Sequence, residues 1–182
     1  MKKKSKCVFI DRDGVINKKA PEGDYVKNWN EFKFLPNITE SIKKLNEEGF
    51  LVIIITNQQG IGKGLMKEQD LKTIHTKMIE KLKKTKAKVD GIYYCPHTEK
   101  DICNCRKPKI GLFLKAKEDF NIDLAKSWMI GDSESDILAG QKAGCKTILV
   151  NGKLNKDNLL IGEVIKCNFI VSDLREAINN II

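Results

Sequence analysis

The sequence has no long run of apolar residues, few aromatic residues and only three arginines against thirty lysines. We expect no membrane-spanning helix, because crossing a bilayer takes roughly 20 consecutive apolar residues. The lysines near the start precede only the short apolar run 7–10, so we expect no secretory signal either. The aromatic residues are not interleaved with the lysines as base stacking would require. We therefore expect a cytoplasmic protein that binds neither membranes nor nucleic acid.

The excess of lysine gives a formal net charge of +9, which could indicate binding to a polyanion. The one dense lysine cluster, residues 81–88, falls where a helix should end, and cations are stabilised at that end of a helix. We interpret it as a solvated face, with a nucleic-acid-binding module as the rival interpretation. Two of the three arginines, Arg12 and Arg106, fall inside motifs described below, which indicates a need for the planar guanidinium group and its paired donors.

Six cysteines without an evident leader are typical of a reducing compartment, with thiol or metal chemistry in place of disulfides. A chain of 182 residues can bury one full hydrophobic core. No repeat, low-complexity tract or linker divides it. We expect a single domain over residues 1–182 and a monomer.

Apolar runs alternate along the chain with segments of helical periodicity. The pattern predicts an α/β fold with a doubly wound, mainly parallel sheet and helices on both faces. One helix should begin at Asn37, with Glu40 completing a capping box, and end at Gly49, while Ser172 should cap the last helix. The predicted strands cover residues 7–10, 50–55, 91–94, 127–130 and 146–150, with a short sixth at 169–171, and the other helices cover 67–84, 111–120 and 133–143.

The first predicted strand ends in two acids, Asp11 and Asp13. Side chains alternate along a strand, so these two point to the same side beyond its end. Carboxylates at the end of a buried strand can hold Mg²⁺ or divide the roles of nucleophile and acid between them. An acidic turn is the alternative interpretation, since Asp and Gly are common in turns.

Polar residues also follow the next three strands of the predicted sheet. Because the carboxyl ends of parallel strands lie at one edge, two more acids, a hydroxyl and two cations should meet the first pair of acids there. Such a set suits phosphoryl transfer through an aspartyl phosphate. The last pair of acids could instead belong to an ordinary helix N-terminus capped by Ser133. The residues concerned are Thr56 and Asn57, Arg106 and Lys107, and Asp132 and Asp136.

Each of the catalytic candidates has a physical task. Asp11 is the candidate nucleophile, and Asp13 is the candidate general acid that then acts as base for water. Thr56 can donate its hydroxyl to phosphate, Lys107 offers a compact positive charge and Arg106 a bidentate fork.

The acids also form a candidate magnesium site. Asp11, Asp132 and a main-chain carbonyl near Asp13 would supply the hard oxygen ligands that Mg²⁺ prefers. Asp136 follows Asp132 by about one helical turn, close enough to orient either Lys107 or a metal-bound water.

The loop 95–105 carries metal-ligand residues in the pattern C-x-H-x5-C-x-C. Three thiols and one imidazole make a closed tetrahedral set for structural Zn²⁺, although ordinary loop cysteines are the alternative interpretation. Arg106 and Lys107 follow at once, so a fixed loop would fix these cations. The zinc candidates are Cys95, His97, Cys103 and Cys105.

Four segments in order resemble the motifs of the haloacid dehalogenase superfamily of phosphatases. The resemblance implies Mg²⁺-dependent hydrolysis through an aspartyl phosphate on Asp11, with Asp13 as acid and base and Asp132 as metal ligand. It also implies a Rossmann-like sheet with strand order 5-4-1-2-3. The segments are Asp11-Arg12-Asp13-Gly14, Thr56-Asn57-Gln58, Arg106-Lys107-Pro108 and Gly131-Asp132-Ser133-Glu134-Ser135-Asp136.

The zinc loop narrows the resemblance to a zinc-containing branch that includes heptose-bisphosphate and histidinol-phosphate phosphatases. Gly23-Asp24-Tyr25-Val26 and residues 91–97 look more like the heptose enzymes, with histidinol phosphate as the alternative substrate. Ser133 stands where some heptose enzymes carry lysine, which leaves the sugar's anomer open. The substrate contacts that the resemblance implies are Gly23, Asp24, Tyr25, Asn57, Gln58, Gln59 and Ser133.

The spacing between the motifs leaves no room for a large cap domain. We expect loops alone, chiefly residues 17–34 and the zinc loop, to cover the site. A small phosphorylated sugar fits such a site best.

Overall fold

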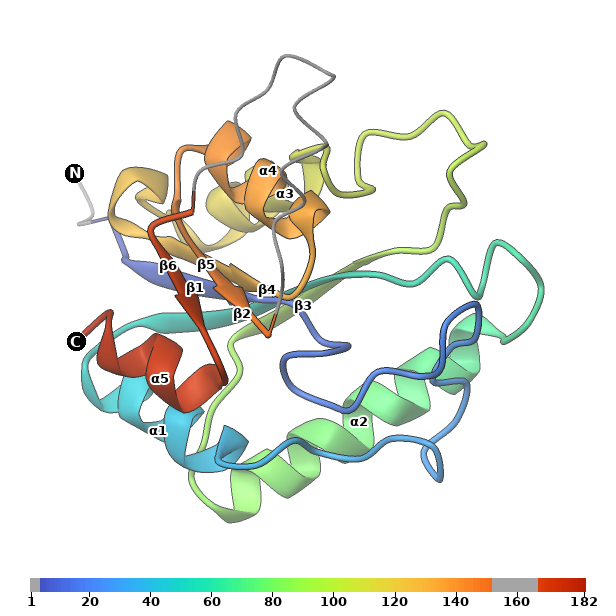
Figure 1. Cartoon of the computed structure of the whole chain (residues 1–182), viewed down its shortest axis with the longest axis horizontal. Coiled ribbons are helices and arrows are strands. Elements are labelled where there is room, and N and C mark those ends of the chain that lie inside the picture. The colour runs from blue at the N-terminus through green and yellow to red at the C-terminus, as the bar shows by residue number, and fades with distance from the viewer. Residues whose placement is uncertain (1–3, 152–166) are drawn as a thin grey trace.

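A computed structural model describes residues 4–151 and 167–182 of the chain, so residues 1–3 and 152–166 of the predicted domain lie outside the description. Six strands form one sheet in the order β3-β2-β1-β4-β5-β6, and each neighbouring pair is parallel (Figure 1). The strands are β1 (Cys7–Ile10), β2 (Leu51–Asn57), β3 (Gly91–Cys95), β4 (Trp128–Gly131), β5 (Lys146–Val150) and β6 (Phe169–Val171).

The predicted fold class is confirmed. The order 5-4-1-2-3 recurs within the observed sheet, and β6 extends it by pairing with the free edge of β5. None of the helices among the described residues has the length and apolar character needed to cross a bilayer.

Alternating side chains of the central strands enter two hydrophobic cores, one on each face of the sheet. Val8 and Ile10 of β1 belong to the core beneath α1, α2 and α5, whereas Cys7 and Phe9 belong to the core beneath α3 and α4 (Figure 1). The helices are α1 (Ile38–Glu47), α2 (Glu68–Lys84), α3 (Gly111–Phe120), α4 (Glu134–Ala143) and α5 (Leu174–Asn179).

Two predicted helix starts are wrong in detail. Asn37 precedes α1 in the left-handed conformation, with φ 61°, and its side chain makes no capping hydrogen bond, so the capping box with Glu40 does not form. Asp173, one residue after the predicted Ser172, caps α5 by accepting a hydrogen bond from the backbone N–H of Glu176. A short 3₁₀ turn at Leu124–Lys126 was not predicted.

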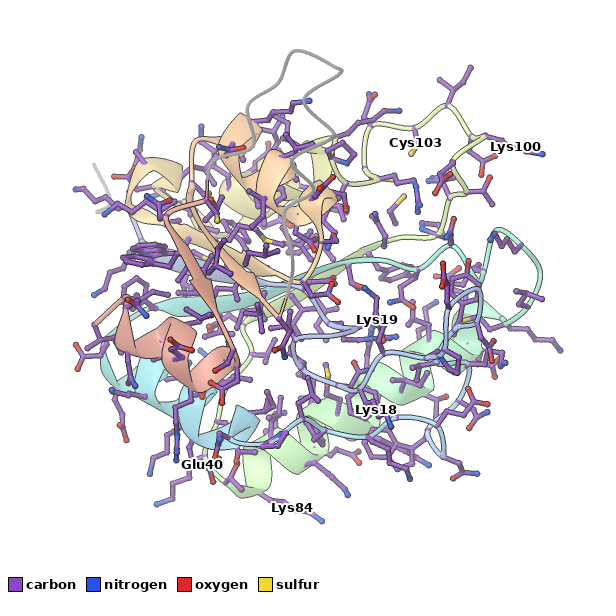
Figure 2. The ribbon with its side chains drawn as sticks, viewed as in Figure 1. Lys18, Lys19, Glu40, Lys84, Lys100 and Cys103 are labelled. Atoms are coloured by element: carbon purple, nitrogen blue, oxygen red, sulfur yellow. The ribbon has the colours of Figure 1, made fainter. Side chains whose placement is uncertain are left out.

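Loops, and no large cap domain, lie over the carboxyl edge of the sheet among the described residues (Figure 1). The loop 17–36 is ordered by buried Val26 and Phe32, and the Phe32 ring stacks on Trp29 at 5.0 Å between centroids. Figure 2 shows Lys19 between the sheet and α2, and Cys103 in the outlying zinc loop.

Candidate active site

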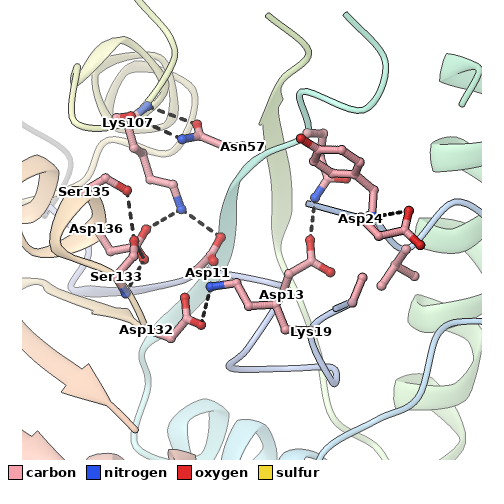
Figure 3. Close-up of a pocket in the computed structure, with 14 residues that line it drawn as sticks. Asp11, Asp13, Lys19, Asp24, Asn57, Lys107, Asp132, Ser133, Ser135 and Asp136 are labelled. Carbon is pink, nitrogen blue, oxygen red and sulfur yellow. Dashed lines mark hydrogen bonds and ion pairs between the residues drawn. The ribbon is translucent and has the colours of Figure 1, made fainter. Parts of the chain in front are cut away.

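A pocket opens where β1, β2 and β4 end, and most of the polar residues predicted there face it together (Figure 3). Asp11 and Asp13 both line it, which the alternation of side chains predicted. Its other polar lining residues are Lys19, Asp24, Tyr25, Asn57, Gln58, Lys107, Asp132, Ser133, Ser135 and Asp136.

Lys107 lies between two carboxylates at the base of the pocket. Its Nζ is 2.7 Å from Asp11 Oδ1 and 2.5 Å from Asp136 Oδ1, and it also donates to the carbonyl of Ile55 at 2.8 Å. Burial raises the pKa of Asp11 to about 7, with Asp136 adding to the rise and Lys107 opposing it. Burial opposes the charge on Lys107, but the two carboxylates outweigh it and raise the pKa of Lys107.

Asp13 is held by three neighbouring side chains. Arg12 Nη2 donates to both its oxygens at 3.0 and 2.8 Å, and amide groups of Asn17 and Gln58 donate at 2.8 Å each. Burial favours the neutral acid, but the charge of Arg12 and these hydrogen bonds outweigh it and lower the pKa of Asp13. Asp13 is therefore held as a carboxylate.

Lys19 is a site residue that sequence reasoning missed. Its Nζ lies 2.7 Å from Asp132 Oδ2, so a loop lysine neutralises the acid at the end of β4. Burial raises the pKa of Asp132, and Lys19 opposes that rise. No pattern in the loop 17–36 indicated this contact, because it depends on how the loop folds back over the sheet.

Two glycines allow the acidic strand ends to come together. A Cβ added to Gly14, whose φ is +93°, would lie 2.0 Å from Asp132 Oδ2. A Cβ on Gly131 would lie 2.1 Å from Asp136 Cβ. Both positions require the absence of a side chain, so the motif glycines are part of the site's geometry.

The residues that follow β2 connect the parts of the site. Thr56 is buried, and its hydroxyl accepts a hydrogen bond from Gln58 Nε2 at 2.9 Å, which leaves the hydroxyl hydrogen free to donate. The Asn57 side chain pairs with the backbone of Lys107, accepting from its N–H at 3.0 Å and donating to its carbonyl at 3.2 Å. This clamp ties the Lys107 loop to β2.

The structure separates some predicted residues from this pocket. Arg106 lines an adjoining cavity and donates to Glu99 at 2.9 Å and to the carbonyl of His97 at 3.5 Å. Thr56, Gly23 and Gln59 are not among the residues that line the main pocket.

The four zinc candidates form one compact cluster. All four ligand atoms lie within 4.8 Å of one another. Four of the six separations lie between 3.0 Å, for the sulfurs of Cys105 and Cys95, and 3.9 Å, for those of Cys95 and Cys103. A tetrahedral zinc site would have ligand separations of roughly 3.5 to 3.8 Å. The cluster can bind zinc with its present side chains.

A second cluster has the oxygen ligands that magnesium prefers. Carboxylate oxygens of Asp11, Asp132 and Asp136 lie within 4.8 Å of one another. Ammonium groups of Lys19 and Lys107 already contact these oxygens, so the cluster attracts cations. The Asp13 carboxylate instead faces Arg12.

A parallel sheet with clustered carboxylates and a buried lysine at its carboxyl edge suits phosphoryl transfer, in which charged groups position and neutralise the phosphate. A family model described as HAD-hydrolase-like matches residues 104–177. These findings indicate a hydrolase of the haloacid dehalogenase class.

Comparison with known proteins narrows the class. The chain is 40% identical over 149 residues to D-glycero-beta-D-manno-heptose-1,7-bisphosphate 7-phosphatase of Haemophilus ducreyi, covering 78% of this chain and 80% of that one. It is also 40% identical over 154 residues to D-glycero-alpha-D-manno-heptose-1,7-bisphosphate 7-phosphatase of Campylobacter jejuni, covering 85% of this chain and 87% of that one. The structure of D,D-heptose 1,7-bisphosphate phosphatase from B. bronchiseptica, complexed with magnesium and phosphate, superposes with a TM-score of 0.84 at 33% identity over 96% of this chain and 97% of that chain. The chain belongs to the family of the heptose-1,7-bisphosphate 7-phosphatases.

Proposed function

We propose that this protein hydrolyses the 7-phosphate of D-glycero-D-manno-heptose 1,7-bisphosphate, releasing the 1-phosphate and inorganic phosphate. The observation that carries the proposal is the group Asp11–Lys107–Asp136 at the base of a pocket beside Asp132, in a chain 40% identical to such enzymes. The relatives named for the two anomers are equally similar to this chain, so the proposal covers both.

Asp11 acts as the nucleophile in this proposal. Its carboxylate attacks the phosphorus, the bond to the sugar oxygen breaks, and an aspartyl phosphate forms. Lys107, at 2.7 Å from Asp11, neutralises the attacking carboxylate and the phosphate oxygens. Asp136, which lies on the far side of Lys107, keeps the ammonium charged and in place.

Asp13 carries the proton in both half-reactions. In the free protein it is a carboxylate, so it must gain a proton before it can act as an acid. A bound phosphate dianion beside it would raise its pKa and favour that gain. Asp13 then protonates the departing sugar oxygen and, as a carboxylate again, takes a proton from the water that attacks the aspartyl phosphate.

Donors around the pocket bind the substrate. Thr56 donates its free hydroxyl hydrogen to the transferred phosphate. Asn57 and Gln58 hold the loop and Asp13 in place while facing the substrate. Arg106, in the adjoining cavity, binds the part of the sugar farther from the reacting phosphate. Further contacts come from Asp24, Tyr25 and Ser133, which line the pocket.

Asp11, Asp132 and the backbone carbonyl of Asp13 would hold the magnesium ion. When bound, the ion supplies positive charge that lets an anionic carboxylate approach an anionic phosphate. The zinc cluster is structural, because its four protein ligands leave no open position. It fixes the loop from which Arg106 and Lys107 project.

We propose a single domain over residues 1–182 without a large cap, working as a monomer in the cytoplasm. All six cysteines are unpaired, and zinc binding requires reduced sulfur. Light scattering on the purified protein measures its mass in solution and so tests whether it is a monomer.

Steady-state kinetics with Mg²⁺ on both anomers of heptose 1,7-bisphosphate and on histidinol phosphate tests the substrate. We expect the largest kcat/KM for a heptose bisphosphate, with one phosphate released per sugar. A larger kcat/KM for histidinol phosphate would reverse the assignment. Oligonucleotide binding that survives Asp11→Asn and falls steeply with salt would favour the nucleic-acid interpretation.

A further inference from the structure

A buried arginine lies directly behind the Asp13 carboxylate. Arg12 is 0% exposed, and its Nη2 donates to both oxygens of Asp13 and, at 3.2 Å, to Gln58 Oε1. A guanidinium keeps its charge in proteins and its donors lie in one rigid plane. A contact to Arg12 Nη1, the other terminal nitrogen, therefore affects the orientation of Nη2 towards Asp13.

That contact is made by His75, which comes from α2. Its Nε2 lies 3.2 Å from Arg12 Nη1, and the residue is 8% exposed. Arginine has no acceptor, so Nε2 must carry the lone pair and the imidazole proton must be on Nδ1. The Tyr94 ring packs against the imidazole at 6.1 Å between centroids.

The surroundings of His75 keep its imidazole neutral. Burial lowers its pKa to about 3, the charge of Arg12 adds to this, and the Asp13 carboxylate opposes it. Arg12 and Asp13 from β1's end and Tyr94 from β3 are the titratable groups that face it. A protonated imidazole would place a second cation against a buried guanidinium.

We propose that His75 is a positioning residue that orients Arg12, and through Arg12 holds Asp13 in the geometry needed for proton transfer. The inference rests on the proposed function, which makes Asp13 the acid and base. His75 touches no reacting atom, so it acts on the rate only through Arg12. Removing its acceptor leaves Arg12 Nη1 without this partner in a buried place, and the guanidinium plane then turns towards another acceptor.

Two substitutions of His75 separate the effect of the hydrogen-bond acceptor from the effect of the side chain's packing. His75→Met replaces the imidazole acceptor with a thioether, which is only a weak acceptor, and keeps the site filled, whereas His75→Gln offers a carbonyl oxygen to Arg12. We expect His75→Met to lower kcat about ten-fold, a part of the roughly 10²- to 10⁴-fold that acid–base catalysis contributes, with little change in KM. The limb of the kcat pH profile that Asp13 controls should move to higher pH, because a displaced Arg12 lowers the pKa of Asp13 less.

The matched control is Met78→Leu, a change of similar volume at a fully buried position on the same helix, which should leave kcat and the pH profile unchanged. His75→Gln should recover most of kcat and restore the profile. Equal activity in wild type and His75→Met, or equal loss in His75→Gln and His75→Met, would overturn the proposal.

Nitrogen NMR of the wild-type protein tests the contact without a variant. The chain has two histidines, so the imidazole signals are readily assigned. We expect His75 to carry its proton on Nδ1 and not to titrate between about pH 5 and 8, where an ordinary histidine does. A proton on Nε2, or titration in that range, would overturn the proposal. An inactive wild-type protein with the expected spectrum would instead overturn the proposed function while the contact stands.

Discussion

Lys19 and Asp132 form an ion pair, with Nζ 2.7 Å from Oδ2, that joins the loop 17–36 to the end of β4. Asp132 is a proposed magnesium ligand, so the lysine and the metal ion compete for one carboxylate. We therefore expect Lys19 to raise the magnesium concentration that the protein needs.

Lys19→Met should bind Mg²⁺ more tightly than the wild type. A partly exposed ion pair of this kind contributes little, so we expect a change of about two- to five-fold in Kd. Calorimetric titration with MgCl₂ in the absence of substrate measures it. Lys18→Met is the control, because Lys18 does not line the main pocket. Weaker binding in Lys19→Met than in Lys18→Met would show that Lys19 helps to hold the ion's site together.

Asp11→Asn should abolish turnover and leave the fold intact. An amide is a poor nucleophile, and the substitution keeps the size of the side chain. Phosphate release and far-UV circular dichroism are the measurements. Turnover above about one part in a thousand of the wild-type kcat would place the nucleophile elsewhere.

The stability of the metal-free protein should depend on pH through Asp11. Burial raises its pKa from 3.8 to about 7, so between these values the folded state binds a proton that the unfolded state lacks. The contribution of Asp11 to stability is therefore greatest below pH 3.8 and is lost as pH rises to about 7. Melting temperatures of wild type and Asp11→Asn, in the presence of a chelator, should diverge in favour of the variant as pH rises. A difference in melting temperature that stays constant with pH would contradict the raised pKa of Asp11.

Gly14→Ala should destabilise the protein more than Gly23→Ala does. Both glycines have positive φ, but an added Cβ meets Asp132 at 2.0 Å at Gly14 and meets nothing within 4 Å at Gly23. Gly23→Ala therefore measures backbone strain alone, about 1–2 kcal/mol. Denaturant unfolding compares the two, and equal losses would mean that Asp132 moves aside without cost.

Cys105→Ser should lose zinc and lower activity together. Wild type should contain about one zinc ion per chain, and the variant should lose most of it. The released loop carries Lys107, so kcat should fall along with the melting temperature. Metal analysis by mass spectrometry is the measurement. Cys145→Ala, at a buried cysteine outside the cluster, should retain the metal. If Cys105→Ser lost its zinc but kept full activity, zinc would not be needed to position Lys107 at the phosphate site.

Patterns of residue type predicted the framework of the site well. The acids that follow β1 and β4 face one pocket because strand ends in a parallel sheet share an edge, and the period of the apolar runs located those strands. The zinc cluster was predictable because its four ligands lie within one short loop.

Contacts between distant segments could not be predicted in this way. Lys19 and His75 have no local pattern, since each becomes part of the site only when a loop or helix packs against the sheet. Asn37 failed as a cap because its backbone is left-handed, a conformation that its sequence allows but does not require.

The two strands at the centre of the sheet, β1 and β4, are far apart along the chain. During synthesis on the ribosome, the first carboxylate pair emerges long before Asp132 and Lys107 can join it. A nascent or truncated chain therefore cannot bring these four side chains together. We expect the site to form only after most of the chain has been translated.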